Sequence, residues 1–306
     1  MKIVEYLLFL NWPERCFRVS PEDIRYLKSL LPRSARVRSV KTERAFLKAL
    51  PSATHVVTWH FRREWYALAP RVKVVATPAA GRELVQLPPP ETKRPPLVHF
   101  GAFHGAIMSE SVAAFVLAWS RGFFHRGSFG KCWPRRELSE ICREVAGTKA
   151  IVFGYGNVGR AIGEKLSALG IAVEGYSRHR PLPVGKLDCD WFVMALPSTT
   201  GTDNLVNAAL LRRLPRRAVL VNVGRGNAVD EKALERALRG GRLAGAYLDV
   251  LKVEPTAAEL TRPGAVRAFL EEKVPNAVVM PHASAFSPAY LRHCFAELSA
   301  HGIFHA

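Results

Sequence analysis

The sequence predicts an α/β protein built from two doubly wound parallel-sheet domains. Short β-rich runs alternate with helical stretches in both halves of the chain, and this order favours parallel sheets that are covered on both faces. The length of 306 residues also exceeds the roughly 250–300 residues at which single cores divide. A proline-rich loop at 88–96 separates the two series, and a strongly apolar helix is expected after it at Ser109–Arg121. The joint between the domains is therefore expected at this helix.

The first half of the chain contains the first series of strands and helices. The run Ser20–Asp23 predicts the start of a helix that continues to Leu31, because serine caps helix N-termini and proline fits the first turn. Two further helices are expected at Glu43–Leu50 and Arg62–Ala69. The strands expected in this half are Lys2–Leu10, Ala35–Val40, Ala53–Trp59 and Val72–Thr77.

The second half repeats the alternation of strands and helices over about 170 residues, a typical size for one domain. The chain contains no internal sequence repeat. A last helix is expected from near Pro288. The strands expected in this half are Ala150–Phe153, Ala172–Gly175, Trp191–Ala195, Ala218–Val223, Gly245–Asp249 and Ala277–Met280.

The composition is that of an ordinary globular protein. Apolar residues make up 48% and charged residues 23%, which excludes a disordered tail, a collagen-like chain and a disulfide-stapled miniprotein. The five cysteines are odd in number and lack the spacing of metal ligands, so a reduced compartment and no metal site are expected. The apolar run Ile3–Leu10 contains Glu5 and ends at Asn-Trp-Pro, which favours a strand over a signal peptide. We therefore expect a cytoplasmic protein without a membrane partner.

The charge balance is unusual: 44 basic residues against 26 acidic ones give a formal net charge of +18. Such an excess attracts anions, which include nucleic acids, membrane surfaces and small acidic metabolites. The arginines are dispersed, and neither a block of like charges nor a zinc-finger or basic-zipper pattern occurs. A solvated basic surface without a nucleic-acid partner is the preferred interpretation.

A glycine-rich motif directly follows the expected strand Ala150–Phe153 and opens a helix expected at Arg160–Leu169. This strand–turn–helix context is typical of the turn that binds a dinucleotide in a Rossmann domain. The first glycine would make the tight turn, the second would admit the pyrophosphate, and the third would let helix and strand pack closely. The helix N-terminus would supply N–H groups to the phosphates. The motif consists of Gly154, Tyr155, Gly156, Asn157, Val158 and Gly159.

The end of the next strand bears on the choice between NAD and NADP. An NAD site usually places an acidic residue there, which accepts hydrogen bonds from the ribose hydroxyls. This chain has Ser177 at that position, followed by Arg178 and Arg180, whereas Glu174 lies too early in the strand. A hydroxyl and two guanidinium groups suit a 2′-phosphate. We expect NADP(H) to be preferred, with NAD(H) as the alternative; otherwise these arginines only add to the basic surface.

Three polar residues follow three apolar strands of the second half: Arg225, Glu254 and His282. Ligands of open α/β sheets bind at these strand ends, so the three side chains are expected to converge. They form a plausible set for reducing a 2-oxo acid. Arg225 would hold the carboxylate and polarise the ketone, and His282 would donate the proton. Glu254 would orient the imidazole and raise its pKa.

At these residues the chain resembles the D-isomer-specific 2-hydroxyacid dehydrogenase family, which includes glyoxylate/hydroxypyruvate reductases, formate dehydrogenases and phosphoglycerate dehydrogenases. The resemblance implies that Arg225, Glu254 and His282 are the catalytic residues and that Asp249 lies near the nicotinamide carboxamide. It also implies further cofactor contacts at Leu196, Pro197, Thr202, Val223, Gly224 and Ser284. The stretches that match are GYGNVGRAIG, ALPSTTGTDNLV, LVNVGRGNAVDEKAL, GAYLDVLKVEP and MPHASAFS.

The resemblance further implies a Rossmann cofactor domain at 109–284 inserted into a flavodoxin-like substrate domain formed by 1–108 and 285–306. The family binds the substrate carboxylate with backbone N–H groups of a loop, which here places Ala80 and Gly81 at the substrate. Arg82 follows them and is either a second contact for an acidic substrate or one more exposed cation. The region equivalent to Gly122–Arg143 contributes to a two-fold dimer in the family, so a homodimer is expected; the alternative is a surface loop.

The expected activity is reduction of a short 2-oxo acid, such as glyoxylate or hydroxypyruvate, to the D-2-hydroxy acid. Two other functions belong to branches of the same family. A corepressor-like module would bind the nucleotide and recruit protein partners, but no peptide-docking motif supports it. A formate- or phosphite-type dehydrogenase would work with NAD, which Ser177 and Arg178 disfavour.

Overall fold

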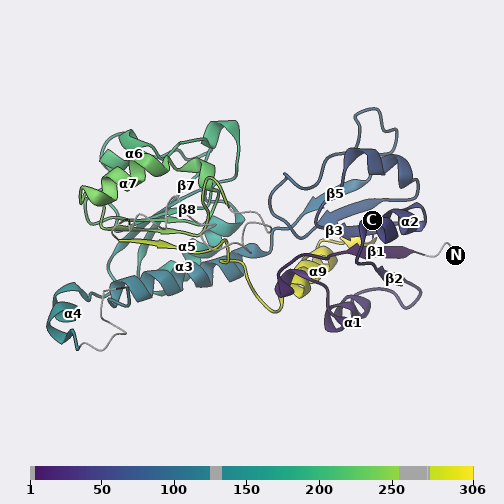
Figure 1. The fold of residues 1–306 in the computed structure, drawn as a ribbon, viewed down its shortest axis with the longest axis horizontal. Helices are drawn as coiled ribbons and strands as arrows, with labels where there is room; N and C mark the ends of the chain where they lie inside the picture. Colours follow the sequence, from purple (N-terminus) through teal and green to yellow (C-terminus); the bar gives the residue numbers. More distant parts are fainter. Residues whose placement is uncertain (1–3, 125–132, 255–273, 275, 306) are drawn as a thin grey trace. The chain divides into compact units, whose positions relative to one another are not determined.

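The computed structural model describes residues 4–124, 133–254, 274 and 276–305 (Figure 1). The chain forms two compact units. Unit 1 consists of Met1–His104 and Phe286–Ala306, and unit 2 of Gly105–Ala285, so unit 2 is inserted into unit 1. These boundaries lie within a few residues of the ones expected for the inserted cofactor domain.

Unit 1 contains a parallel five-stranded sheet in the order β2-β1-β3-β4-β5. This order is typical of flavodoxin-like domains. The strands are β1 (Glu5–Phe9), β2 (Arg36–Ser39), β3 (His55–Thr58), β4 (Val74–Thr77) and β5 (Leu97–Phe100). The helices are α1 (Pro21–Ser29), α2 (Glu43–Ala49) and α9 (Tyr290–Ala300), with short 3-10 turns at Arg15–Phe17, Leu50–Ser52, Arg63–Leu68 and Ile303–His305.

Strand β1 is buried on both faces, as expected for the interior of a parallel sheet. Leu7 and Phe9 pack into a core with Phe46 of α2 on one side. Tyr6 points to the other side, where its hydroxyl donates a hydrogen bond to the carbonyl of Phe304. Both segments of unit 1 therefore share one folded body.

Two expectations for unit 1 were wrong in detail. The segment expected as a helix at Arg62–Ala69 is the 3-10 turn Arg63–Leu68, too short for a regular α-helix. Strand β5 was not expected, because it directly follows two prolines. It lies at the edge of the sheet beside β4, where neighbouring prolines disturb no other strand.

Unit 2 contains a parallel six-stranded sheet in the order β11-β10-β9-β8-β6-β7. The strands are β6 (Lys149–Phe153), β7 (Ala172–Tyr176), β8 (Trp191–Met194), β9 (Val219–Asn222), β10 (Gly245–Leu248) and β11 (Ala277–Val279). The helices are α3 (His104–Ser120), α4 (Arg135–Ile141), α5 (Asn157–Ala168), α6 (Ala208–Arg213) and α7 (Glu231–Arg239), with 3-10 turns at Thr200–Thr202 and Gly226–Ala228.

Separate cores cover the two faces of this sheet. Leu210 of α6 and Leu234 of α7 belong to one core. Val116 of α3 and Ile162 of α5 belong to the other. Figure 1 shows these helix pairs on opposite sides of the strands. The unit is thus doubly wound, as the alternating sequence pattern predicted.

The order of the strands reverses at β6, which pairs with β7 on one side and with β8 on the other. Ligands of doubly wound sheets bind at such a reversal, outside the carboxyl ends of the strands. The loops after β6, β7, β8, β9, β10 and β11 all leave the sheet at this edge, because every strand is parallel to its neighbours. The sequence-predicted site residues of unit 2 lie on these loops.

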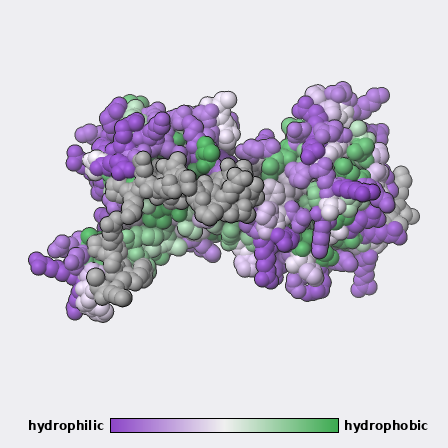
Figure 2. Space-filling view, viewed as in Figure 1, coloured by the Kyte–Doolittle hydropathy of each residue, from purple (hydrophilic) through white to green (hydrophobic). Residues whose placement is uncertain are grey.

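Polar side chains dominate the face of each unit that is visible in Figure 2, in keeping with the net charge of +18. Within the described ranges, no helix combines the length and the apolar character needed to cross a membrane.

Candidate active site

The glycine motif connects β6 to α5, and its glycines meet different surroundings. Gly154 has a φ of +102°, and a Cβ there would lie 2.6 Å from the carbonyl oxygen of Ala195. A Cβ on Gly159 would lie 2.2 Å from the carbonyl oxygen of Gly154. Gly156, by contrast, faces open space, since no atom of a residue other than its chain neighbours lies within 4 Å of the position its Cβ would take. Gly154 and Gly159 therefore serve the turn and the packing, and Gly156 leaves room for a ligand.

Helix α5 begins at Asn157, earlier than expected, and no side chain caps its N-terminus. An uncapped N-terminus presents backbone N–H groups and the positive end of the helix dipole to an anion. The phosphates of a dinucleotide fit this end of the helix, beside the open position at Gly156.

The side chain of Tyr155 turns away from the open side of the loop. Its ring lies against Gly175 of β7, where a Cβ would come within 2.3 Å of it, and its hydroxyl lies beside Gly163 of α5. Tyr155 also donates its backbone N–H to the carbonyl of Tyr176. It is a packing residue of the loop, so any part in holding a cofactor falls to its backbone.

A tight turn closes the loop after β7. Ser177 and Arg180 exchange backbone hydrogen bonds of 2.7 and 3.1 Å. The guanidinium of Arg180 lies 5.0 Å from the ring centroid of Tyr176, whose hydroxyl donates to the carboxylate of Glu174. Arg178 is exposed, and within the described residues its side chain has no hydrogen bond or ion pair. Glu174, the acid nearest to the strand end, is thus hydrogen-bonded to Tyr176, whereas the guanidinium of Arg178 at the turn is unpaired in the part of the chain that the structure describes.

The loops after β8 and β9 pack against each other. A Cβ on Gly224 would lie 2.6 Å from the backbone N and O of Leu196. Thr202 closes the first loop by donating its hydroxyl to the carbonyl of Pro197 at 2.8 Å. Val223 is buried beneath the turn. These predicted cofactor positions lie together at the edge of the sheet where the glycine motif lies.

Arg225 stands at the turn after β9, and the buried side chain of Asn222 organises that turn. Asn222 Oδ1 accepts from the N–H of Gly224 at 3.1 Å, and its Nδ2 donates to the carbonyl of Arg225 at 3.1 Å. The guanidinium Nη1 donates to the carbonyl of Gly224 at 3.0 Å. Sequence reasoning missed Asn222; the available signal was an amide at the end of an otherwise apolar strand.

Asp249 follows β10, is only 1% exposed, and holds the loop after β11. Its Oδ1 accepts from the N–H groups of Ala283 at 2.9 Å and Ser284 at 3.0 Å. Its backbone carbonyl accepts from the N–H of His282 at 2.8 Å. Burial raises the pKa of Asp249, although the hydrogen bonds from the loop act in the opposite direction. The expected residue near the nicotinamide is therefore also the anchor of the histidine loop.

Ser284 is buried, and both its hydroxyl and its backbone carbonyl are hydrogen-bonded within the protein. Its hydroxyl lies 3.1 Å from the hydroxyl of Tyr247, and its carbonyl accepts from Ser111 Oγ at 3.0 Å. The predicted cofactor contact at Ser284 thus lies in a hydrogen-bonded joint between β10, α3 and the loop after β11.

His282 and Glu254 form a pair: Nδ1 of the imidazole lies 2.9 Å from Oε2 of the carboxylate. A carboxylate can only accept, so Nδ1 donates and Nε2 is the free nitrogen of the ring. His282 has a φ of +52°, a conformation that non-glycine residues rarely adopt. The other oxygen of Glu254 accepts from the N–H of Leu251 at 3.3 Å.

The charges of the pair are coupled. The hydrogen bond to Glu254 raises the pKa of His282 and outweighs the effect of burial. Burial acts to raise the pKa of Glu254, but the hydrogen bond and charge of His282 outweigh it, so the net shift is downward. Arg225 lowers the pKa of both groups, which places its positive charge near the pair. The structure therefore brings all three predicted catalytic residues to one place in unit 2.

The predicted substrate loop belongs to unit 1 and follows β4. The backbone N–H groups of Ala80 and Gly81 make no hydrogen bond to any described residue. The guanidinium of Arg82 lies 5.3 Å from the ring centroid of Phe100, so this cation stacks on an aromatic side chain of β5. Free N–H groups beside a cation are suitable for binding a carboxylate.

A family model described as "D-isomer specific 2-hydroxyacid dehydrogenase, NAD binding domain" matches residues 113–284. This range covers more than half of the chain. The chain belongs to this family. Its fold of two parallel-sheet α/β units is that of its structural neighbours, so the expected fold class is confirmed.

Individual relatives support the same assignment. The chain is 30% identical over 216 residues to a glyoxylate reductase of Thermococcus kodakarensis, covering 63% of this chain and 64% of the relative. It is 28% identical over 240 residues to a D-3-phosphoglycerate dehydrogenase of Haemophilus influenzae, covering 73% of this chain and 56% of the relative. The matched part thus spans less than two thirds of either relative.

Solved structures share the fold over nearly the whole chain. A D-isomer specific 2-hydroxyacid dehydrogenase from Lactobacillus delbrueckii, complexed with NAD, has a TM-score of 0.71 at 20% identity, covering 98% of this chain and 96% of that one. A family member from Xanthobacter autotrophicus, in complex with NADPH and MES, has a TM-score of 0.68 at 24% identity, covering 96% and 93%. A nicotinamide cofactor is therefore expected in unit 2, and the comparisons do not distinguish NAD from NADP.

The different surroundings of the glycines give a testable prediction. Gly156→Ala meets no protein atom, so it should leave the thermal unfolding midpoint nearly unchanged while weakening NADPH binding about tenfold or more, because its Cβ occupies the ligand's space. Gly159→Ala should destabilise unit 2 by roughly 1–3 kcal/mol through its clash with the Gly154 carbonyl. Differential scanning fluorimetry and fluorescence titration measure both effects. Equal loss of stability in the two variants would contradict the assignment.

The histidine–glutamate pair gives a second prediction. Glu254→Gln should lower the pKa of His282 toward its ordinary value of about 6.5, because the carboxylate stabilises the imidazolium. The protonated fraction at neutral pH would then fall. Titration of labelled histidine by NMR measures this shift, with Glu235→Gln as a control, since Glu235 pairs with Arg239 on the surface. An unchanged His282 titration in Glu254→Gln would overturn the coupling.

Proposed function

We propose that this protein reduces a short 2-oxo acid to the D-2-hydroxy acid with NADPH as the preferred cofactor. One observation carries the proposal: the hydrogen-bonded His282–Glu254 pair lies near Arg225 at the carboxyl ends of neighbouring strands. An acid, its orienting carboxylate and a fixed cation are what the reduction of a charged ketone requires.

The residues of unit 2 fit a nicotinamide dinucleotide. Open space at Gly156, the uncapped N-terminus of α5 and the free cation at Arg178 suit its phosphates. When bound, the reduced nicotinamide supplies the hydride that the reaction consumes.

His282 supplies the proton in this proposal. Its Nδ1 is bonded to Glu254, so Nε2 carries the transferable proton in the imidazolium form. The raised pKa of His282 keeps that form populated at higher pH than for an isolated histidine. As pH rises through this pKa the acid is lost, so the reductive rate should fall on the alkaline side.

Arg225 binds the carboxylate of the substrate and polarises its ketone. Its turn is fixed by Asn222, so the guanidinium needs little reorganisation when the acid binds. In unit 1, the free backbone N–H groups of Ala80 and Gly81 are also suited to a carboxylate. The net charge of +18 favours recruitment of anionic substrate and cofactor, an effect that salt screens.

The preference for NADPH rests on the turn after β7. Glu174 is bonded to Tyr176, so it is unsuited to accept the ribose hydroxyls. Ser177 and Arg178 stand at the strand end, where a hydroxyl and an exposed guanidinium favour a 2′-phosphate.

A homodimer is part of the proposal. Phe123 and Phe124, which follow α3, and Trp133, which precedes α4, are exposed apolar side chains, and Trp133 is 88% exposed. Exposed aromatic groups of this kind are typical of protein interfaces. Residues 125–132 of the segment expected to grip a partner lie outside the described residues. Sedimentation velocity measures the oligomeric state.

Cofactor oxidation tests the activity. NADPH and NADH would be supplied with glyoxylate, hydroxypyruvate, pyruvate, phenylpyruvate or oxaloacetate. We expect turnover with at least one acid, and a loss of about 100-fold or more in kcat for His282→Ala, because general acids contribute at least this much. His293→Ala, which removes an exposed histidine of α9, should be fully active. Tight NADPH binding without turnover on any acid would favour a nucleotide-dependent binding protein instead.

The cofactor preference gives a separate prediction. Arg178→Ala should raise the KM for NADPH about tenfold and leave the KM for NADH nearly unchanged, since a charge-assisted hydrogen bond contributes roughly 1.5–3 kcal/mol. Steady-state kinetics with both cofactors measure it. Arg239→Ala is the matched control, because it removes an arginine paired with Glu235 on α7. Equal effects of Arg178→Ala on both cofactors would refute the role of Arg178 in selecting NADPH.

A further inference from the structure

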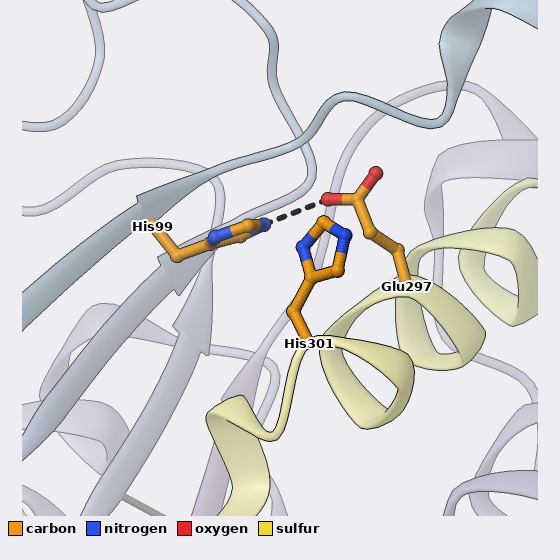
Figure 3. Close-up of side chains that lie close together, drawn as sticks. All are labelled: His99, Glu297 and His301. Atoms are coloured by element: carbon orange, nitrogen blue, oxygen red, sulfur yellow. Dashed lines mark hydrogen bonds and ion pairs between the residues drawn. The ribbon is translucent and has the colours of Figure 1, made fainter.

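A cluster of three metal-binding side chains lies in unit 1, and it includes none of the residues assigned above. It consists of His99 on β5, Glu297 on α9 and His301 at the C-terminal end of α9 (Figure 3). One ligand atom from each residue lies within 4.8 Å of the other two. In Figure 3 the three side chains converge from the strand and the helix toward one point.

The sequence positions explain the convergence. Glu297 and His301 are four residues apart, so they lie on one face of the helix, one turn apart. His99 comes from the edge strand of the five-stranded sheet and faces this side of the helix. Sequence reasoning did not find the cluster, because 198 residues separate His99 from Glu297.

Glu297 is held firmly in place. Its side chain is only 10% exposed, and both carboxylate oxygens accept from the backbone N–H of Ala102, at 3.1 and 2.9 Å. Its Oε1 also lies 2.7 Å from Nε2 of His99, which is 16% exposed. A nearly buried carboxylate and imidazole are thus preorganised, while the exposed side chain of His301 is free to turn toward them.

We infer that His99, Glu297 and His301 bind a divalent transition-metal ion of the Zn²⁺ type. Two imidazoles and one carboxylate are ligands that zinc and its neighbours prefer, whereas Mg²⁺ and Ca²⁺ need more oxygen ligands. Zinc–ligand bonds of about 2.0–2.2 Å in a tetrahedral site hold ligand atoms roughly 3.3–3.6 Å apart. His99 and Glu297 would therefore open from their 2.7 Å contact, and the exposed His301 would turn toward them. The metal takes the place of the proton between His99 and Glu297, and water fills the remaining position.

The bound ion would connect β5 to α9 directly. These two elements come from the two segments of unit 1 that flank the inserted unit 2. Because the ion binds only the folded arrangement of ligands, it would stabilise unit 1 and raise its unfolding temperature. The site is therefore structural or regulatory, and it includes none of the residues proposed for reduction.

Co²⁺ and Zn²⁺ titrations of the full chain, without a polyhistidine tag, test the inference. We expect one Co²⁺ per chain, detected by its visible absorption, which Zn²⁺ displaces. His301→Ala should weaken binding by more than about tenfold, as the loss of a ligand requires. The side chain of His301 is exposed, so this variant should fold normally. His293→Ala removes an exposed histidine from the same helix and should bind like the wild type.

A thermal-shift measurement accompanies the titration. Zn²⁺ should raise the unfolding midpoint of the wild type and of His293→Ala, and not that of His301→Ala. The inference is overturned if the wild type binds neither ion. It is also overturned if His301→Ala binds as tightly as the wild type, or if a thiolate-to-cobalt band shows that cysteines hold the ion instead.

Discussion

The buried carboxylate of Asp249 is the interaction on which the candidate active site depends. It lies at the end of β10 and accepts the backbone N–H groups of Ala283 and Ser284, while its own carbonyl accepts that of His282. A charged group in this position is costly unless it is hydrogen-bonded, so the loop after β11 and the carboxylate stabilise each other. The loop thereby holds His282 at a positive φ, from which its ring reaches Glu254.

The turn that carries Arg225 is built in the same way. There the buried amide of Asn222 accepts from the N–H of Gly224 and donates to the carbonyl of Arg225. Both anchors are polar residues at the ends of apolar strands, inside a sheet whose two faces are packed by helices. The packed sheet holds the loops rigidly, and the loops carry the reactive side chains. The proposed acid His282 and the proposed anion-binding cation Arg225 therefore need little reorganisation to act together.

Sequence patterns predicted much of this arrangement. The strand–turn–helix context identified the glycine loop, and the positions of Arg225, Glu254 and His282 after apolar strands placed them at one sheet edge, since parallel strands end on the same side. Contacts between distant parts of the chain were not predictable. The inward turn of Tyr155 depends on the absence of side chains at Gly163 and Gly175, and strand β5 depends on its pairing with β4. The cluster at His99 and Glu297 exists only because β5 and α9 meet.

Hydrogen–deuterium exchange of the backbone amides at Ala283 and Ser284 tests the role of Asp249 most directly. In the wild type these amides should exchange slowly, because the buried carboxylate accepts both of them. In Asp249→Ala they should exchange at least about tenfold faster, corresponding to the loss of roughly 1.4 kcal/mol of protection. The amides of β6 and α5 serve as the internal reference for general unfolding and should be unchanged. Equal protection of Ala283 and Ser284 in both proteins would show that another interaction holds the histidine loop.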